Sequence, residues 1–391
     1  MKLVVVGLGQ CGGRIADEFA RLNRKAQSQR GIEIVTGAFA VNTDIADLSG
    51  LNRIRPDYNH RILIGNRKTG GHGVGKINEL GAEVAREDAD KVIDTIRANK
   101  RFAETDAFLL VAGAAGGTGS GAIPIMTKFI KERFIDKPVY AAVVLPFEHE
   151  EQTEERTVYN AATCLKSTYL VADAIIIIDN QRYVVKESPI QSNLSSINTQ
   201  IVEPFYNLLC AGEEKKPKYI GAKLLDAGDI IQTLAGWTVI GHSSVRISLF
   251  QLLFQQVRDF RKKVGETQKG IQAMDQAMSS LSLRGNPGDS RRALYLVAAP
   301  AKKMNVDLLK ELGIYLRNLA PEAIIRSGDY PRDRRSLDVS VILSELSDAP
   351  KVRNYFTKTI GLMTAMKKRQ EGTESAYSAI EGSFKDIPSL L

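Results

Sequence analysis

The chain has 391 residues, of which 43% are hydrophobic and 25% are charged, so it is a folded globular protein too long for one ordinary domain core. Its net charge of +8 is carried by short basic runs without interleaved aromatic residues, and we expect no nucleic-acid partner. No apolar run approaches the roughly 18 residues that span a bilayer, and the cysteines and histidines show no disulfide or metal spacing, so we expect a cytoplasmic protein with no transmembrane segment and no metal held by side chains.

The first half of the chain alternates apolar runs with helical patterns, which is typical of a mostly parallel sheet with helices on its faces. The predicted strands are Lys2–Val6, Ile32–Val41, Arg61–Ile64, Phe108–Ala112, Val139–Leu145 and Ala174–Ile178. The predicted helices are Gly13–Leu22, one from near Lys76, one carrying Ile123, Met126, Ile130 and Phe134, and a long one at Asn198–Ala211 that Pro204 would kink or delay. This alternation predicts an α/β fold with a Rossmann-like first domain.

The second half predicts a smaller α/β unit. Its predicted elements are a helix at Asp229–Trp237, a strand at Thr238–Ile240, an amphipathic helix with Leu249, Leu253, Val257 and Phe260, a strand at Ala293–Ala299, a helix at Val306–Leu319, and strands near Ala323–Arg326 and Leu337–Leu343. We place the boundary between the two units within residues 212–228.

The first glycine loop, Gly7–Gly12, fits the pattern G-x-G-x-x-G between a predicted strand and a predicted helix. Glycines let the backbone approach a phosphate, and the helix start supplies free N–H groups. A dinucleotide site also needs an acidic residue about 20 residues further on. The nearest candidate at a strand end, Asp44, lies too far away. The pattern therefore indicates a phosphate loop of unsettled type, and a tight turn without ligand is the alternative.

The second loop, Gly70–Lys76, nearly matches the P-loop pattern, but Ile77 stands where that pattern needs a hydroxyl for Mg²⁺. A working P-loop is therefore not expected. The four glycines at Gly70, Gly71, Gly73 and Gly75 still suggest a loop that cradles an anion.

The third loop gives the strongest signal. Five glycines fall within residues 113–121, directly after a predicted buried strand. A simple turn needs only one or two glycines. Successive small residues expose a row of backbone N–H groups, to which Thr118 and Ser120 add hydroxyl donors. This loop predicts a phosphate site.

Ala115–Gly121 reads A-G-G-T-G-S-G, and this loop resembles the signature loop of the tubulin/FtsZ superfamily. Gly9–Gly12, Asn42–Asp44 and residues 69–76 resemble other phosphate loops of that family in the same order. The run Gln10–Arg14 and the G-H-G-V-G segment are most similar to the archaeal CetZ branch. Over essentially the whole chain, the resemblance implies a GTP-binding domain at 1–197, a central helix and catalytic loop at 198–228, a C-terminal α/β domain at 229–360 and a helical tail at 361–391.

The resemblance assigns GTP or GDP to one set of residues: Gly9, Gln10, Cys11, Gly12, Gly13, Arg14, Asp44, Gly70, Gly71, Gly73, Ala115, Gly116, Gly117, Thr118, Gly119, Glu150, Asn180 and Asn198. Among these, Glu150 matches the carboxylate for the ribose, with Glu151 as the alternative, and Asn180 matches a nucleoside contact. Asn198 matches the residue that binds the base. An amide can pair with guanine or with adenine, so the identity of the base depends on the resemblance. Mg²⁺ would be held mainly by phosphates and water.

The segment Leu224–Asp229 resembles the family's acidic loop, which completes the active site of the next subunit. Two carboxylates three residues apart, Asp226 and Asp229, can orient a water and accept its proton. They are the predicted catalytic pair. By composition alone, Asp229 fits the N-cap of the following helix better. Leu224 replaces the family's asparagine, which puts the hydrolysis rate in question.

The resemblance implies a cytoskeletal GTPase that assembles head to tail and controls cell shape. An FtsZ-type division GTPase and a nucleotide-binding scaffold with little hydrolysis are alternatives, and an NAD-dependent oxidoreductase is the alternative from a different class. The segment Asp386–Leu391 resembles the peptide with which FtsZ tails bind membrane-anchor proteins. We expect this tail rather to dock on its own domain, and a membrane anchor is the second interpretation.

Overall fold

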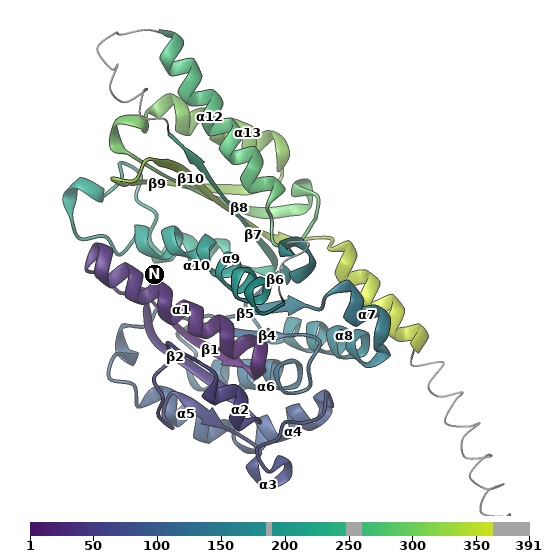
Figure 1. Cartoon of the computed structure of the whole chain (residues 1–391). Helices are drawn as coiled ribbons and strands as arrows, with labels where there is room; N and C mark the ends of the chain where they lie inside the picture. The colour runs from purple at the N-terminus through teal and green to yellow at the C-terminus, as the bar shows by residue number, and fades with distance from the viewer. Residues whose placement is uncertain (185–189, 248–259, 363–391) are drawn as a thin grey trace, which may run out of the picture.

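A single mixed sheet of ten strands runs through the part of the chain that the computed structural model describes, residues 1–184, 190–247 and 260–362 (Figure 1). Its strand order is β3-β2-β1-β4-β5-β6-β7-β10-β8-β9. The strands are β1 Leu3–Leu8, β2 Val35–Asn42, β3 Arg61–Leu63, β4 Ala107–Gly113, β5 Val139–Leu145, β6 Ala174–Asp179, β7 Gly236–Arg246, β8 Ser290–Ala299, β9 Ile324–Pro331 and β10 Ser336–Leu346.

Strand β7 joins the two halves of the molecule. Its first residues, Gly236–Thr238, pair in parallel with β6, and Val239–Arg246 pair antiparallel with β10. The strands from β3 to β7 are all parallel, and the antiparallel pairs lie only beside β10. The predicted α/β class is confirmed, and the second α/β unit extends the first sheet instead of forming a sheet of its own.

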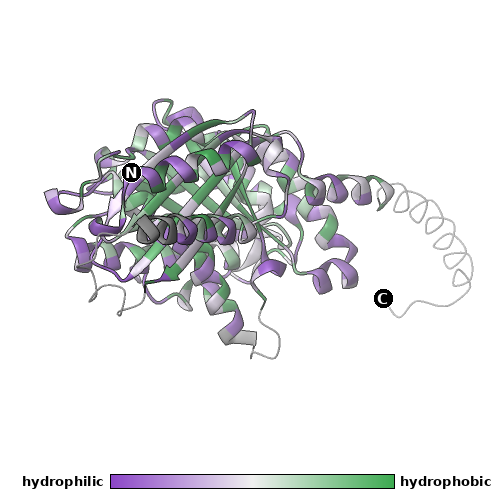
Figure 2. Ribbon diagram, turned by 90° about the horizontal axis from the view of Figure 1, so that it is seen from above, coloured by the Kyte–Doolittle hydropathy of each residue, from purple (hydrophilic) through white to green (hydrophobic). Residues whose placement is uncertain are grey.

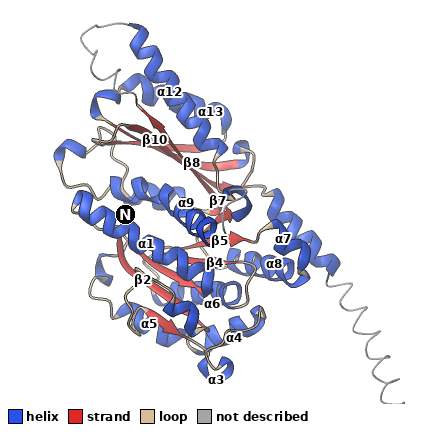
Figure 3. Cartoon of the chain, viewed as in Figure 1, coloured by secondary structure: helices blue, strands red, loops and turns tan. Residues whose placement is uncertain are grey.

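Helices cover both faces of the sheet (Figures 2 and 3). Along β1, Val4 and Val6 belong to one buried apolar cluster, and Leu3 and Val5 to the other, as the two-residue period of a strand requires. One face is covered by α1 Gly9–Arg30, α9 Ile190–Ala211 and α10 Ala227–Thr233. The other is covered by α4 Asn78–Glu87, α5 Ala89–Arg97, α6 Thr118–Arg133, α8 Glu155–Tyr169, α12 Phe260–Ser279 and α13 Val306–Leu319. Three short helices lie on the loops: α2 Ile45–Ser49, α3 Asn66–Thr69 and α7 Glu148–Thr153.

Several helix starts differ from the predicted ones. Helix α1 begins at Gly9, inside the predicted glycine loop, and α9 begins at Ile190 instead of Asn198, with Pro204 inside it. Glycine, serine and asparagine are weak helix formers, and packing on the sheet overrides that preference here. The amphipathic helix predicted around Leu249 lies largely outside the described residues, as does the tail peptide.

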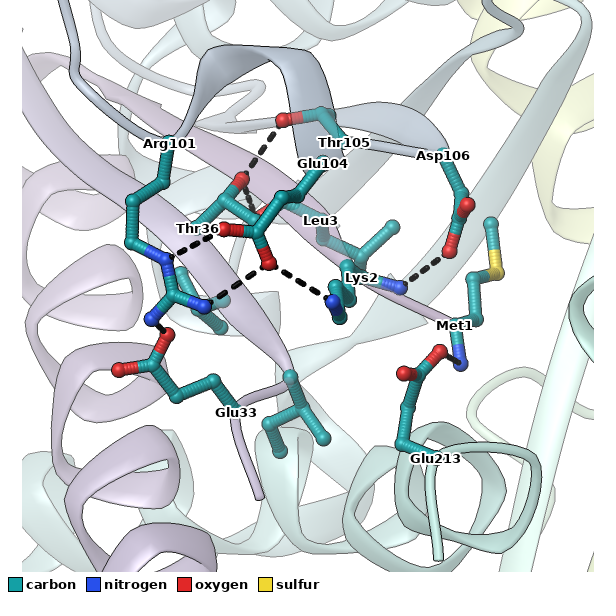
Figure 4. Close-up of polar contacts among 12 residues, drawn as sticks. Met1, Lys2, Leu3, Glu33, Thr36, Arg101, Glu104, Thr105, Asp106 and Glu213 are labelled. Atoms are coloured by element: carbon teal, nitrogen blue, oxygen red, sulfur yellow. Dashed lines mark hydrogen bonds and ion pairs between the residues drawn. The ribbon is translucent and has the colours of Figure 1, made fainter.

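A polar network ties together the amino ends of β1, β2 and β4 (Figure 4). The backbone N–H of Lys2 donates to Asp106 at 2.6 Å, and the Lys2 ammonium pairs with Glu104 at 2.8 Å. The hydroxyls of Thr36 and Thr105 lie 2.7 Å apart in the interior. These contacts hold the amino ends of the three strands. The carboxyl ends lie at the opposite edge of the sheet, where the glycine loops follow.

Two glycines bring α4 and α6 into direct contact. A Cβ on Gly121 would overlap the carbonyl of Asn78, and a Cβ on Gly81 would overlap the carbonyl of Gly117. The start of α6 is therefore pressed against α4, and its position depends on these two glycines.

We expect Gly121→Ala to lower the free energy of unfolding by about 1–3 kcal/mol, because overpacking exceeds the gain of about 1 kcal/mol in helix propensity. Urea unfolding measures the change. Gly285→Ala is the matched control, because a Cβ there meets no atom within 4 Å. Equal stability of both variants would contradict the close packing of α4 on α6.

Candidate functional site

A cavity of about 660 Å³ opens at the carboxyl ends of β1 and β4. Strand β1 lies between β2 and β4, so the chain leaves these neighbouring strands toward opposite sides, and open α/β sheets bind ligands at such a point. Most of the residues assigned to GTP line this cavity: Gly9, Gln10, Cys11, Arg14, Asp44, Gly73, Ala115, Gly116, Gly117, Thr118, Gly119, Glu150, Asn180 and Asn198.

The first glycine loop spans the end of β1, at Gly7 and Leu8, and the first turn of α1, Gly9–Gly12. Leu8 precedes the helix without any side-chain cap, and the first turn holds no acidic residue. The first N–H groups of a helix have no partner within it, so those of Gly9–Gly12 can bind an anion. Gly12 does not line the cavity, and its role is close packing, since a Cβ would overlap the carbonyl of Val111 in β4. Gly13 is buried beside it and does not line the cavity either.

The signature loop leads into α6 in the same way. Gly117 is the N-cap residue and offers no side-chain cap, and the first turn holds no acidic residue. The two helix starts touch, because a Cβ on Gly9, whose φ is +70°, would lie 2.9 Å from the backbone nitrogen of Gly119. Thr118 is fixed by Thr43, whose hydroxyl lies 2.7 Å from its own. The N-termini of α1 and α6 therefore converge on one cavity.

The buried side chain of Asn160 on α8 holds two loops together. Its amide lies 2.9 Å from the carbonyl of Lys76 and 3.0 and 3.2 Å from those of Ala115 and Gly116. Its Oδ1 atom is buried without a hydrogen-bond partner. No role for Asn160 is predicted from the sequence. The available signal was a polar residue on the buried face of α8, between Thr157 and Cys164 at helical spacing.

Fewer glycines of the second loop line the cavity than the sequence predicts. Gly73 and Lys76 line the cavity, whereas Gly70 and Gly71 do not. Gly70 ends α3 with a φ of +60°, and Gly71, at +81°, accepts a hydrogen bond from the N–H of Ile45. These two glycines therefore allow the left-handed backbone conformation of the loop after α3. Lys76 itself has a φ of 63°, an uncommon value for a residue with a side chain.

Charged and polar groups between α1 and α2 are held in place by short hydrogen bonds. Asp44 caps α2 through the N–H groups of Ala46 and Asp47. Asp47 accepts from Gln10 at 2.6 Å and from Asn42 at 3.0 Å. Burial, together with the carboxylate of Glu150, raises the pKa of the Cys11 thiol to about 12, so this thiol stays protonated at neutral pH.

At the other end of the cavity, Glu150 and Asn180 come from α7 and from the turn η2 Asn180–Tyr183. The carboxylate of Glu150 accepts the N–H of Phe147 at 2.9 Å. Glu151 does not line the cavity and contacts Tyr355 instead, which favours Glu150 for the predicted role. Asn198 lies well inside α9, which removes the interpretation of this residue as an N-cap.

Several residues that line the cavity have no binding role predicted from the sequence. They are Leu8, Asn42, Asp47, Lys76, Gly113, Val144, Leu145, Pro146, Phe147, His149, Gln181, Val184, Asn193, Leu194 and Ile197. Asn193, Leu194 and Ile197 share one face of α9 with Asn198, and placing the helix start at Asn198 concealed that face. Phe147 and His149 stack with ring centroids 5.6 Å apart, but nothing in their local sequence indicates a binding role.

The predicted catalytic pair lies away from this cavity. Asp226, not Asp229, is the N-cap of α10, which corrects that part of the prediction. Asp226 accepts the N–H of Asp229 at 2.9 Å, and Asp229 pairs with Arg326 of β9 at 3.4 Å. Neither side chain lines the cavity of its own chain.

The loop that carries this pair is held firmly. The buried carboxylate of Asp329 accepts the backbone N–H groups of Ala222 at 3.1 Å and Lys223 at 2.6 Å. The N–H of Asp329 donates to the carbonyl of Lys223 at 3.0 Å. The acidic loop is therefore presented as a fixed feature at the surface, with Asp226 exposed.

Comparison with known sequences gives two family matches that together cover nearly the whole chain. Residues 2–185 match the GTPase domain of the tubulin/FtsZ family, and residues 187–360 match the C-terminal domain of tubulin-like CetZ proteins. The tubulin-like protein CetZ1 of Haloferax volcanii is 33% identical over 372 residues, which is 90% of each chain.

Solved structures agree with this result. The GDP-bound monomer of CetZ1 from Haloferax volcanii matches with a TM-score of 0.79 and 29% identity, over 93% of this chain and 100% of that one. The GTPγS-bound protofilament of CetZ2 from the same organism matches with a TM-score of 0.80 and 26% identity, over 94% and 100%. Among the described residues, no helix is both long and apolar enough to cross a membrane.

Proposed function

The chain belongs to the tubulin/FtsZ family, in its CetZ branch, and we propose that it binds GTP, polymerises head to tail into a cytoplasmic filament and hydrolyses GTP to GDP and phosphate where two subunits meet. The observation that carries the proposal is the separation of the predicted catalytic pair from the cavity. The phosphate loops surround one cavity, while Asp226 and Asp229 stand on a rigid loop that does not reach it. The similarity to CetZ2, which is found as a GTPγS-bound protofilament, supports nucleotide binding and self-assembly.

The phosphates would lie against the starts of α1 and α6. Their N–H groups and helix dipoles favour an anion, and Arg14 adds a positive charge on the wall. The ribose and base would extend toward Glu150, Asn180 and Asn198. In this arrangement each chain binds its own nucleotide.

Mg²⁺ fits this site as an ion held by phosphates and water. The described residues contain no cluster of three or more side chains suited to a metal, and the carboxylates of Asp44 and Asp47 already accept hydrogen bonds from the protein. Bound there, Mg²⁺ would neutralise phosphate charge during transfer. Residues Asp44 and Asp47 could contact it through water.

Hydrolysis needs a group that orients the attacking water. In a head-to-tail contact, the acidic loop of one subunit would meet the phosphates of the next. Asp226 would then exchange its bond to the N–H of Asp229 for a water, and accept a proton from it. Assembly would thereby complete the catalytic site. The cellular role that we propose is the control of cell shape, because the C-terminal half matches CetZ proteins.

A filament with little hydrolysis is the second candidate function. Leu224, which is 47% exposed, places an apolar side chain beside the catalytic pair. A polar residue there could help to hold a water, and leucine cannot. The two candidates share nucleotide binding and assembly, and they differ only in turnover.

Gly116→Val should abolish GTP binding without loss of folding. A Cβ at Gly116 meets no atom within 4 Å, and the residue lines the cavity, so the larger side chain would occupy space needed by phosphate. In thermal unfolding, GTP at about 100–1,000 times its Kd should stabilise the wild type by roughly 3–4 kcal/mol and leave this variant unchanged. Gly285→Val serves as control and should respond like the wild type. Stabilisation of the wild type by NADH but not by GTP would instead favour the oxidoreductase.

Asp226→Ala should keep GTP affinity, because the residue does not line its own cavity. It should reduce hydrolysis by a factor of about 10²–10⁴, the usual contribution of a positioned base. Its filaments should persist, since GTP is no longer consumed, and light scattering with phosphate release measures both effects. Wild-type turnover in this variant would remove Asp226 from catalysis, and a wild type as slow as the variant would favour the static filament.

A further inference from the structure

A helix at residues 350–362 packs against the GTP-binding half, beside α7 and α8 (Figure 1, yellow). Its buried side chains, Val352, Tyr355 and Thr359, follow helical spacing. The hydroxyl of Thr359 donates to the carbonyl of Val158 on α8, and the Tyr355 hydroxyl donates to Glu151 on α7. The contact is therefore an ordered interface and involves both polar and apolar groups.

Lys358 pairs with Glu151 at 3.7 Å, and the rest of the charged part of this interface is formed by Lys351. The Lys351 ammonium lies 2.8 Å from Asp179 at the end of β6 and 3.8 Å from Glu151 on α7. Both carboxylate side chains are only 11% exposed, and the Lys351 side chain is 22% exposed. Loss of Lys351 would be costly mainly at Asp179, whose buried charge would lose this cation, whereas Glu151 would keep Lys358.

Each of these two carboxylates has a chain neighbour that lines the nucleotide cavity. Glu151 follows Glu150, and Asp179 precedes Asn180. Asp179 also accepts the N–H of Gln181 at 3.1 Å, which fixes the turn that begins with Asn180. Lys351 therefore forms ion pairs with both segments that carry the groups assigned to the nucleoside, and it does so outside the nucleotide cavity.

A second polar cavity, of about 650 Å³, lies between the helix and these segments. Gln181 lines both this cavity and the nucleotide cavity, so it forms the wall between them. The side-chain oxygen of Gln181 also accepts the N–H of Glu148 at 3.3 Å, which ties η2 to α7. A shift of α7 or η2 would therefore change the lining of both cavities.

We propose that Lys351 is a positioning residue for the nucleoside half of the site, so that docking of the helix at 350–362 and nucleotide binding strengthen each other. The proposal rests on the GTP-binding function proposed above. Lys351 does not line the nucleotide cavity, and it acts through Asp179 and Glu151 on Asn180 and Glu150. By linkage, each event must favour the other by the same factor. Nucleotide binding would thereby stabilise the docked position of the helix at 350–362, which precedes the C-terminal tail in the sequence.

The first test uses full-length Lys351→Met. We expect Kd for both GTP and GDP to rise about tenfold, within the usual range of coupling between sites. In assembled protein, KM should rise while kcat stays unchanged, because the phosphate and catalytic groups are untouched. Arg353→Met is the matched control: it removes the same charge from the same helix, but its side chain is 69% exposed and pairs with Asp348. Wild-type affinity in Lys351→Met, or an equal loss in Arg353→Met, would overturn the proposal.

The second test needs no variant. Hydrogen exchange of the backbone amides at residues 352–359 is measured in the wild-type monomer with and without GDP. Saturating GDP should slow exchange in this helix by about the factor lost in Lys351→Met. Unchanged exchange would overturn the coupling even if GDP binds. If the wild type binds neither GDP nor GTP, the proposed function itself fails, so the two failures are distinguishable.

Discussion

Two helix N-termini without caps meet at one point of the sheet, and the rest of the structure depends on that meeting. The starts of α1 and α6 touch through Gly9 and Gly119, and neither first turn carries an acidic side chain. Their free N–H groups would be costly to leave unsatisfied in the interior. An anion in the cavity would satisfy them. Gly12, Gly81 and Gly121 are needed because only glycine allows the helices to pack this closely on β4 and α4.

The same sheet keeps the acidic loop apart from the cavity. Strand β9 lies at the far edge, where Asp329 and Arg326 hold the loop and its second carboxylate. The capping box of α10 keeps Asp226 and Asp229 engaged with each other in the single chain. In a single subunit, neither carboxylate of the acidic loop therefore lines the cavity that we propose for the nucleotide. This geometry favours catalysis between subunits over catalysis within one.

The glycine loops at the cavity were predictable because their sequence pattern is local. Glycine clusters after apolar strands specify a backbone that approaches an anion, and Gly116–Gly119 line the cavity as expected. Contacts between segments that are distant in the sequence are not marked by any such local pattern. Asn160 is separated from Gly116 by α6, β5, α7 and the start of α8, and Gln181 reaches the cavity only because β6 pairs with the sheet. The start of α9 was misplaced because serine and asparagine are weak helix formers, and packing decides there. As an N-cap of α10, the alternative to its catalytic role, Asp229 could not be distinguished from Asp226 by residue type, and only the backbone shows that Asp226 is the cap.

The central claim is that assembly completes the catalytic site, and the most direct test is GTP turnover per subunit as a function of protein concentration. Over about a hundredfold range, the account predicts almost no turnover in dilute protein and a steep rise once filaments form, as mass action requires for a site shared between subunits. Sedimentation of the same samples locates the onset of assembly, which should coincide with that rise. A turnover per subunit that stays constant across the range would contradict the shared site.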